Sequence, residues 1–178
     1  PSGRFQSASG QKMCEDCSEG TFSDNAGTST CSACEAGKVT ASKGLTLCSA
    51  CPSGKSQSAS GQSTCEDCGE GTFAGTTGTS TCTACDAGRV SASPGSTSCR
   101  ACPSGRYQSA SGQSTCEDCP DGTSASTKGS SICGAGDAGM FSLQGAVNCS
   151  QCGAGKYSLT SASSCTNCTR GGYSASAA

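Results

Sequence analysis

The chain has 178 residues, of which 33% are hydrophobic, with no Trp and a formal net charge of −2. So little apolar surface cannot offset the conformational entropy of folding around an ordinary core. The interspersed charges form no basic patch, so we expect no nucleic-acid partner, and no apolar run is long enough for direct membrane insertion of this segment.

Nineteen cysteines, about one residue in ten, indicate a disulfide scaffold. Such scaffolds form in oxidising compartments, so the chain is expected in the secretory pathway, secreted or at the cell surface. The cysteines recur as CxxC pairs, with a step of seventeen residues as far as Cys133 and sixteen afterwards. This fixed period predicts an array of small units that stack on their neighbours. Pairs begin at Cys14, Cys31, Cys48, Cys65, Cys82, Cys99, Cys116, Cys149 and Cys165, and at Cys133 the second cysteine is replaced by Gly136.

In chain order the repeats define four segments. Residues 1–13 are the tail of a truncated repeat, and residues 14–132 hold seven 17-residue repeats. Residues 133–164 hold two divergent 16-residue repeats, and 165–178 are a partial repeat. Three units make a 51-residue super-repeat, because CEDC recurs in every third unit. Both edges stop inside a unit, so we expect a piece of a longer array.

Two glycines are nearly fixed in each unit, one three residues after the CxxC and one four residues before the next cysteine, as in Gly20 and Gly27. Ser161 takes the second position in one unit. Glycines at fixed offsets predict turns with positive φ. Segments between them, such as TFSD and KVTA, can form short strands. We expect small disulfide-rich repeats that form an elongated rod of irregular β-hairpins, with little regular secondary structure and no single core.

All the aromatic residues occupy one slot, two residues after the first glycine. We interpret this side chain as a cover for the disulfides and the main apolar contact of each unit. The alternative is a ladder of ligand-stacking rings. Val39 and Val90 take the slot in two units, and Ser56 and Ser124 are polar exceptions. The aromatic residues are Phe5, Phe22, Phe73, Tyr107, Phe141, Tyr157 and Tyr173.

The segments CEDCSEGTFSDNAGTSTCSAC and CRACPSGRYQSASGQSTCEDC resemble the GCC2/GCC3 repeats, also called ephrin-receptor-like cysteine-rich repeats. The array is more distantly similar to the tumour-necrosis-factor-receptor and furin-like cysteine-rich rods. The resemblance covers the whole chain and implies a disulfide-linked rod in an extracellular setting. It implies no particular ligand, because such repeats are spacers in some proteins and binding surfaces in others.

Three disulfide schemes stay open, because connectivity does not follow from sequence alone. The preferred block scheme joins neighbouring CxxC pairs first to first and second to second, and leaves only Cys119 as a free or intermolecular thiol. A ladder scheme joins each second cysteine to the next first cysteine and leaves Cys14, Cys149 and Cys168 without partners. A block scheme shifted by one unit leaves more. The preferred pairs are Cys14–Cys31, Cys17–Cys34, Cys48–Cys65, Cys51–Cys68, Cys82–Cys99, Cys85–Cys102, Cys116–Cys133, Cys149–Cys165 and Cys152–Cys168.

Metal-binding, redox and catalytic roles for the CxxC cysteines and the Glu-Asp pairs have weaker support in the sequence. CxxC pairs can bind zinc, but the chain has no His and too few apolar residues around each candidate site. A thioredoxin-type redox pair lacks a βαβ context. We interpret the Glu-Asp pair inside each CEDC as solvated loop charge. We therefore expect no metal, no cofactor and no enzymatic activity.

The chain has two N-glycosylation sequons, at Asn148 and Asn167, each with an unfavourable Cys in the middle position. Ser/Thr-rich runs are candidate O-glycan carriers or simple polar loops. The leading hypothesis is an extracellular spacer, or a subunit of a surface filament or matrix, that self-associates or contacts other extracellular proteins. The alternatives are a receptor or adhesion ectodomain that binds a protein, and a metal-binding cysteine array. A specialised contact is expected at residues 133–148, the most divergent unit.

Overall fold

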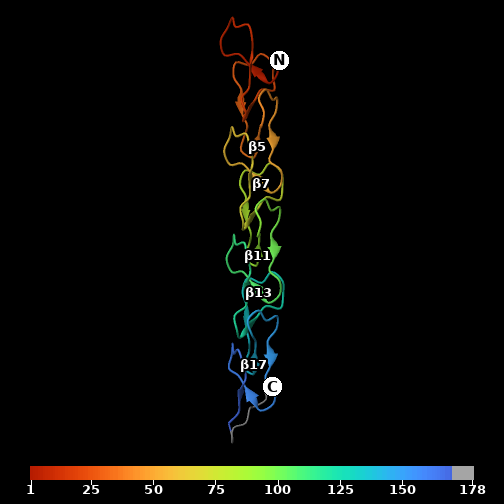
Figure 1. Ribbon diagram of the computed structural model, residues 1–178, viewed down its shortest axis with the longest axis vertical. Coiled ribbons are helices and arrows are strands. Elements are labelled where there is room, and N and C mark those ends of the chain that lie inside the picture. Colours follow the sequence, from red (N-terminus) through yellow and green to blue (C-terminus); the bar gives the residue numbers. More distant parts are fainter. Residues whose placement is uncertain (170–178) are drawn as a thin grey trace. The chain divides into compact units, whose positions relative to one another are not determined.

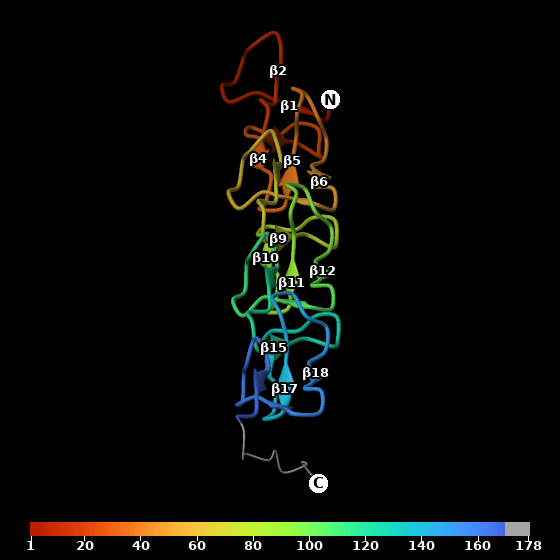
Figure 2. The same cartoon turned by 60° about the horizontal axis from the view of Figure 1, so that its bottom comes forward.

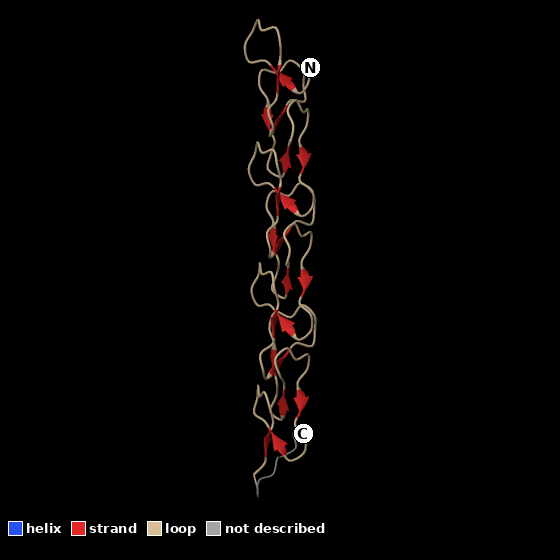
Figure 3. Cartoon of the chain, viewed as in Figure 1, coloured by secondary structure: helices blue, strands red, loops and turns tan. Residues whose placement is uncertain are grey.

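The computed structural model describes residues 1–169, in which twenty two-residue strands pair as ten antiparallel hairpins and no helix occurs (Figure 3). The predicted class of short irregular hairpins without a single core is confirmed. The hairpins are β1 (Arg4–Phe5) with β2 (Glu15–Asp16), β3 (Thr21–Phe22) with β4 (Ser32–Ala33), β5 (Lys38–Val39) with β6 (Ser49–Ala50), β7 (Lys55–Ser56) with β8 (Glu66–Asp67), β9 (Thr72–Phe73) with β10 (Thr83–Ala84), β11 (Arg89–Val90) with β12 (Arg100–Ala101), β13 (Arg106–Tyr107) with β14 (Glu117–Asp118), β15 (Thr123–Ser124) with β16 (Gly134–Ala135), β17 (Met140–Phe141) with β18 (Ser150–Gln151), and β19 (Lys156–Tyr157) with β20 (Thr166–Asn167).

Each hairpin begins at the first glycine of one repeat and returns through the two residues inside the next CxxC. In the β3–β4 hairpin, Thr21 lies opposite Ala33 and Phe22 opposite Ser32. Gly20, just before the hairpin, and Gly27, in its loop, have positive φ, +77° and +79°. The structural module therefore straddles two CxxC pairs.

The predicted positive φ is confirmed at both glycine positions throughout the described residues. Ser161, the exception in the sequence, adopts the same left-handed conformation with φ of 56°. Two further members of the pattern, Gly171 and Tyr173, lie outside the described residues.

The chain divides into two compact units. Unit 1 comprises Pro1–Ala84 and Ser93–Ser98, and unit 2 comprises Cys85–Ala92 and the described part of 99–178. Within unit 1 the hairpins follow one another along one direction (Figures 1 and 2), and the β1–β2 and β7–β8 hairpins have the same orientation (Figure 3). Within unit 2 the same holds for β13–β14 and β19–β20. Equivalent residues of the 51-residue super-repeat therefore face the same side within a unit.

Backbone hydrogen bonds join each hairpin to the following ones. In unit 1 the Gly20 N–H donates to the Thr40 carbonyl at 3.0 Å, and the Gly61 N–H donates to the Cys34 carbonyl at 2.8 Å. The two backbone segments approach so closely that a Cβ added to Gly20 would lie 1.9 Å from the Gly61 carbonyl oxygen. The first glycine is therefore required for stacking as well as for the turn.

The buried interior is a column of second cysteines together with the residue that follows the aromatic slot. Cys17 and Cys34 are fully buried, and Thr40 is 1% exposed. The slot itself is less buried than predicted: Phe22 is only half-buried and Tyr157 is 47% exposed. Alternation along a strand turns the slot residue away from the side on which the next residue faces the interior. Disulfides and small polar residues, more than aromatic rings, therefore form the core.

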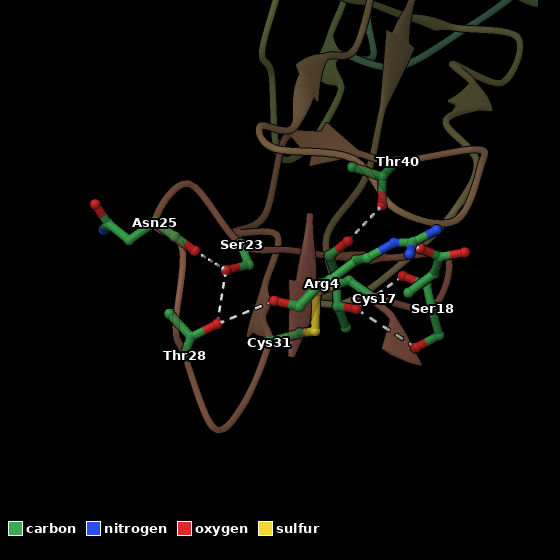
Figure 4. Close-up of a disulfide and its surroundings, with 10 residues drawn as sticks. Arg4, Cys17, Ser18, Ser23, Asn25, Thr28, Cys31 and Thr40 are labelled. Carbon is green, nitrogen blue, oxygen red and sulfur yellow. Dashed lines mark hydrogen bonds and ion pairs between the residues drawn. A yellow bond between two sulfur atoms is a disulfide. The ribbon is translucent and has the colours of Figure 1, made fainter. Parts of the chain in front are cut away.

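Small hydroxyl side chains hold the loop beside the Cys17–Cys31 disulfide (Figure 4). Beside the Cys17–Cys31 bond, the buried Ser23 hydroxyl donates to the Asn25 carbonyl at 2.9 Å and lies 2.9 Å from the Thr28 hydroxyl. No buried side-chain nitrogen or oxygen of the described residues lacks a hydrogen-bond partner. The buried polar side chains of this Ser/Thr-rich chain therefore find their hydrogen-bond partners within the stack of hairpins.

Candidate functional site

Eight disulfides join the described residues, and each links the second cysteine of one CxxC to the first cysteine of the next. The Cα–Cα distance in the Cys17–Cys31 pair is 5.7 Å, an ordinary value. The bonded cysteines are 14 residues apart, except for 13 in the last pair. The pairs are Cys17–Cys31, Cys34–Cys48, Cys51–Cys65, Cys68–Cys82, Cys85–Cys99, Cys102–Cys116, Cys119–Cys133 and Cys152–Cys165.

This is the ladder, so the preferred block pairing is wrong. The residues inside each CxxC form a strand, and side chains three positions apart on a strand point to opposite faces. The two cysteines of one pair therefore cannot both face the same neighbouring CxxC. The first cysteine reaches back to the preceding hairpin and the second reaches forward to the following one. None of the pairs of the block scheme is present: Cys14–Cys31, Cys17–Cys34, Cys48–Cys65, Cys51–Cys68, Cys82–Cys99, Cys85–Cys102, Cys116–Cys133, Cys149–Cys165 and Cys152–Cys168.

The free thiols follow from the ladder. Cys119, expected to be free, is fully buried and bonded to Cys133. The free cysteines are instead Cys14, which is exposed, and Cys149 and Cys168, which are half-buried.

The ladder has one gap, between position 136 and Cys149. The Gly136 N–H donates to the Gly122 carbonyl at 2.9 Å, as the Cys34 N–H does to Gly20 at 2.9 Å, so the backbone is unchanged. A Cβ added to Gly136 would lie 2.9 Å from the Cys149 Sγ and 3.6 Å from its Cβ. The second distance suits a disulfide. The gap is therefore the loss of one side chain, which leaves a thiol in place.

Ser124 occupies the slot beside this thiol. The Cys149 S–H donates to the Ser124 Oγ at 3.5 Å. At the other polar slot, the Ser56 Oγ lies 3.2 Å from Sγ of the disulfide-bonded Cys82. Each contact places the slot residue against the first cysteine of the second CxxC that follows it. At Ser56 that cysteine belongs to a disulfide, which agrees with the predicted position of the slot over the disulfides.

Comparison with known families accounts for this repeated geometry. A sequence model of the family described as tyrosine-protein kinase ephrin type A/B receptor-like matches residues 3–46, 54–99 and 93–132. These matches cover more than half of the chain. The chain belongs to this family. No individual curated protein matches it.

In this ephrin-receptor-like array the Glu-Asp pairs lie in strands and not in loops. Asp16 lies opposite Arg4, with 2.6 Å between Oδ1 and Nε. The same cross-strand ion pair recurs between Lys55 and Asp67 at 2.8 Å. The predicted loop location is therefore wrong, although these side chains are partly exposed as expected. The signal was available, since a basic residue follows the first glycine wherever CEDC closes the hairpin.

A structural side chain that the sequence analysis missed is the glutamine of the QSAS segments. Gln57 is 9% exposed, and its Nε2 donates to the Thr64 carbonyl at 2.8 Å while its Oε1 accepts from the Ala59 N–H at 3.0 Å. Gln108 makes the equivalent bonds in unit 2. Recurrence of QSAS every 51 residues was the signal.

Both sequon asparagines lie on the surface of the ephrin-receptor-like array. Asn148 immediately precedes the free Cys149, and Asn167 lies in β20 opposite Lys156 and precedes the free Cys168. Both side chains are exposed. Within residues 1–169, the cysteine in the middle of each sequon forms no disulfide.

The divergent segment 133–148 combines several unusual features. Met140 and Phe141 form β17 and are half-buried, whereas Leu143 is 64% exposed and Val147 43% exposed. Ile132, immediately before the segment, is 71% exposed. Exposed apolar side chains thus lie close in sequence to the gap in the ladder.

Within residues 1–169, no group of three or more His, Cys, Asp or Glu side chains is arranged to hold a metal ion. Sixteen of the nineteen cysteines are already committed to disulfides. The same residues include no helix that could cross a membrane.

Proposed function

We propose that this chain is an extracellular structural protein, in which the tandem repeats act as a spacer or as a subunit of a surface filament or matrix. The family and the disulfides support an extracellular or secreted setting and a role of the ectodomain type. We also propose that the repeats are of the GCC2/GCC3 type and that the chain has no enzymatic activity. The lack of any His in the sequence removes the commonest general base.

The observation that carries the proposal is the uniformity of the inter-hairpin bonds. The first glycine donates to the hairpin that follows it in unit 1, as Gly37 to the Gln57 carbonyl at 2.7 Å, and in unit 2, as Gly105 to the Ala125 carbonyl at 2.8 Å. Even the divergent unit keeps this bond, from Gly139 to the Ser158 carbonyl at 3.1 Å. A stack in which every module makes the same contacts favours a spacer over a binding domain built around one site.

A protein-binding ectodomain is the second candidate, favoured by the exposed apolar side chains at Ile132, Leu143 and Val147. A contiguous exposed apolar patch marks a contact surface between proteins, whereas single exposed apolar side chains are ordinary. The disulfides take up the thiolates that a zinc site would need, which speaks against a metal-binding array.

The test is a deletion of residues 54–104, which removes one complete super-repeat. The new junction joins Ser53 to Gly105, so the local sequence PSG is preserved and Cys51 can pair with Cys116. We expect the shortened chain to be secreted with three fewer disulfides, with Cys51–Cys116 as its one new pair and with the remaining pairs unchanged. Small-angle scattering should give a shorter maximum dimension.

A control deletion of residues 54–95 removes a similar length out of phase and should give reshuffled disulfides. Electron microscopy of the parent chain then separates the two candidates, since a filament subunit assembles with rising concentration whereas an ectodomain stays monomeric. A compact particle whose maximum dimension does not change with the in-phase deletion would contradict the spacer.

A further inference from the structure

We infer that Asn148 is an N-glycan acceptor, and that the missing side chain at position 136 keeps this acceptor open. The inference goes beyond the spacer role and rests only on the secretory setting. The sequon is Asn148-Cys149-Ser150. In a complete ladder its middle cysteine would be bonded to a cysteine at position 136.

Elsewhere, the first cysteine of a CxxC is usually tied to the preceding hairpin. Cys133 is bonded to Cys119, and Cys165 to Cys152. A residue that directly precedes such a cysteine is held at the start of a strand whose position is fixed by a covalent bond. The transferase acts on a segment that it can bend around the asparagine amide, so an early disulfide at the middle residue of the sequon opposes glycosylation.

Cys149 escapes this restriction because its partner position is Gly136. The Cys149 Sγ meets only a weak acceptor, the Ser124 Oγ at 3.5 Å. The backbone around Gly136 follows the same path as in the closed modules. The substitution therefore frees Cys149 without unfolding the hairpin that presents Asn148.

Asn148 itself has the geometry that an acceptor needs. Its side chain is exposed and makes no hydrogen bond to any other described residue. Ser150, which supplies the sequon hydroxyl, is the first residue of β18 and is also exposed. Neighbouring Val147 is 43% exposed, so the first sugars of a glycan would cover apolar surface.

Asn167 offers an internal comparison. Asn167-Cys168-Thr169 is also a sequon with a free middle cysteine and an exposed asparagine. The residue at position 136 does not decide whether Cys168 is free. We expect both asparagines to be modified and only Asn148 to respond to changes at Gly136.

The experiment expresses the 178-residue chain behind a signal peptide in a eukaryotic secretory host. Peptide mapping by mass spectrometry after enzymatic removal of N-glycans in heavy-oxygen water marks each occupied asparagine. We expect the mark on Asn148 and Asn167, loss of the first in Asn148→Gln, and no change in Asn25→Gln, whose asparagine has no sequon.

The decisive variant is Gly136→Cys. It should form a disulfide with Cys149, reduce occupancy at Asn148 at least several-fold and leave occupancy at Asn167 unchanged. The double variant Gly136→Cys/Cys149→Ala, which cannot form that bond, should have the same occupancy at Asn148 as Cys149→Ala alone, which excludes an effect of the new cysteine by itself.

An unmodified Asn148 in the parent chain overturns the inference, whatever the state of Asn167. Equal occupancy in the parent and in Gly136→Cys, with the new disulfide mapped, overturns the role of the gap. A secreted chain with eight disulfides and no glycan would leave the proposed function intact, whereas a retained, reduced chain would count against that function itself.

Discussion

At the scale of the residue, glycine acts in two different ways. Gly20 has a positive φ and its added Cβ would overlap the Gly61 carbonyl oxygen, whereas Gly27 has a similar φ and open space around it. Gly27→Ala should therefore cost only left-handed strain, about 1–2 kcal/mol. Gly20→Ala should cost about 1–3 kcal/mol more, because two hairpins must separate. Denaturant unfolding of both variants measures the difference, and equal losses would contradict the close approach.

A second residue-scale prediction concerns the glutamine that closes a loop. Gln57→Ala removes the partners of the Thr64 carbonyl and the Ala59 N–H. We expect a loss of about 1–2 kcal/mol and faster amide exchange at Ala59. Gln62→Ala is the matched control, since Gln62 is exposed and its bond to the Ser60 carbonyl is long, at 3.5 Å. Unchanged exchange at Ala59 in the first variant would contradict the role assigned to Gln57.

A third residue-scale prediction concerns Tyr107, whose hydroxyl donates a hydrogen bond to the Glu117 Oε2 at 3.1 Å. The hydrogen bond and the negative charge of Glu117 both raise the pKa of Tyr107 above its ordinary value of 10.0. The interaction therefore favours folding below about pH 10 and is lost as the pH rises through the raised pKa. Glu117→Gln should lower the pKa of Tyr107 in a titration followed by NMR, whereas Glu66→Gln, opposite Ser56, should not.

At the scale of the element, the hairpin is the unit of stability, and each normally has one disulfide. Gly136→Cys should add the ninth, because its Cβ would lie 3.6 Å from that of Cys149. We expect the number of alkylated thiols to fall from three to two. The loop is similar in length to the others, so the chain-entropy gain is about 3 kcal/mol.

The control for this variant is Ala135→Cys, at the exposed neighbouring position in β16. It should keep Cys149 free and raise the thiol count. A higher unfolding midpoint for both variants alike would indicate that the bond does not account for the gain.

At the scale of the whole molecule, disulfides take the place of a hydrophobic core. The most buried side chains of the described residues are mainly the second cysteines of each CxxC. Each disulfide typically stabilises by about 2–4 kcal/mol. We therefore expect mild reduction to abolish protection from proteolysis and amide exchange throughout the chain. Protection that survives complete reduction would show that packing alone holds the hairpins together.

The repeat period, the glycine offsets and the cysteine count determined by themselves that the chain is a stack of disulfide-closed hairpins with positive-φ turns. These features are local, since Gly20 adopts its φ within a few residues of the chain. The sequence could not decide the pairing of Cys17, because block and ladder schemes satisfy the same period. Only the tertiary structure decided it: the strand inside each CxxC turns its two cysteines to opposite faces.

The same reason moved the free thiol from Cys119 to Cys149. Likewise, the cross-strand register placed Asp16 beside Arg4, which a reading of the CEDC segment alone put in a loop. The stacking of successive hairpins also decided which residues are buried. It placed Thr40 in the interior, whereas among the described slot residues only Val90, at 8% exposed, is buried.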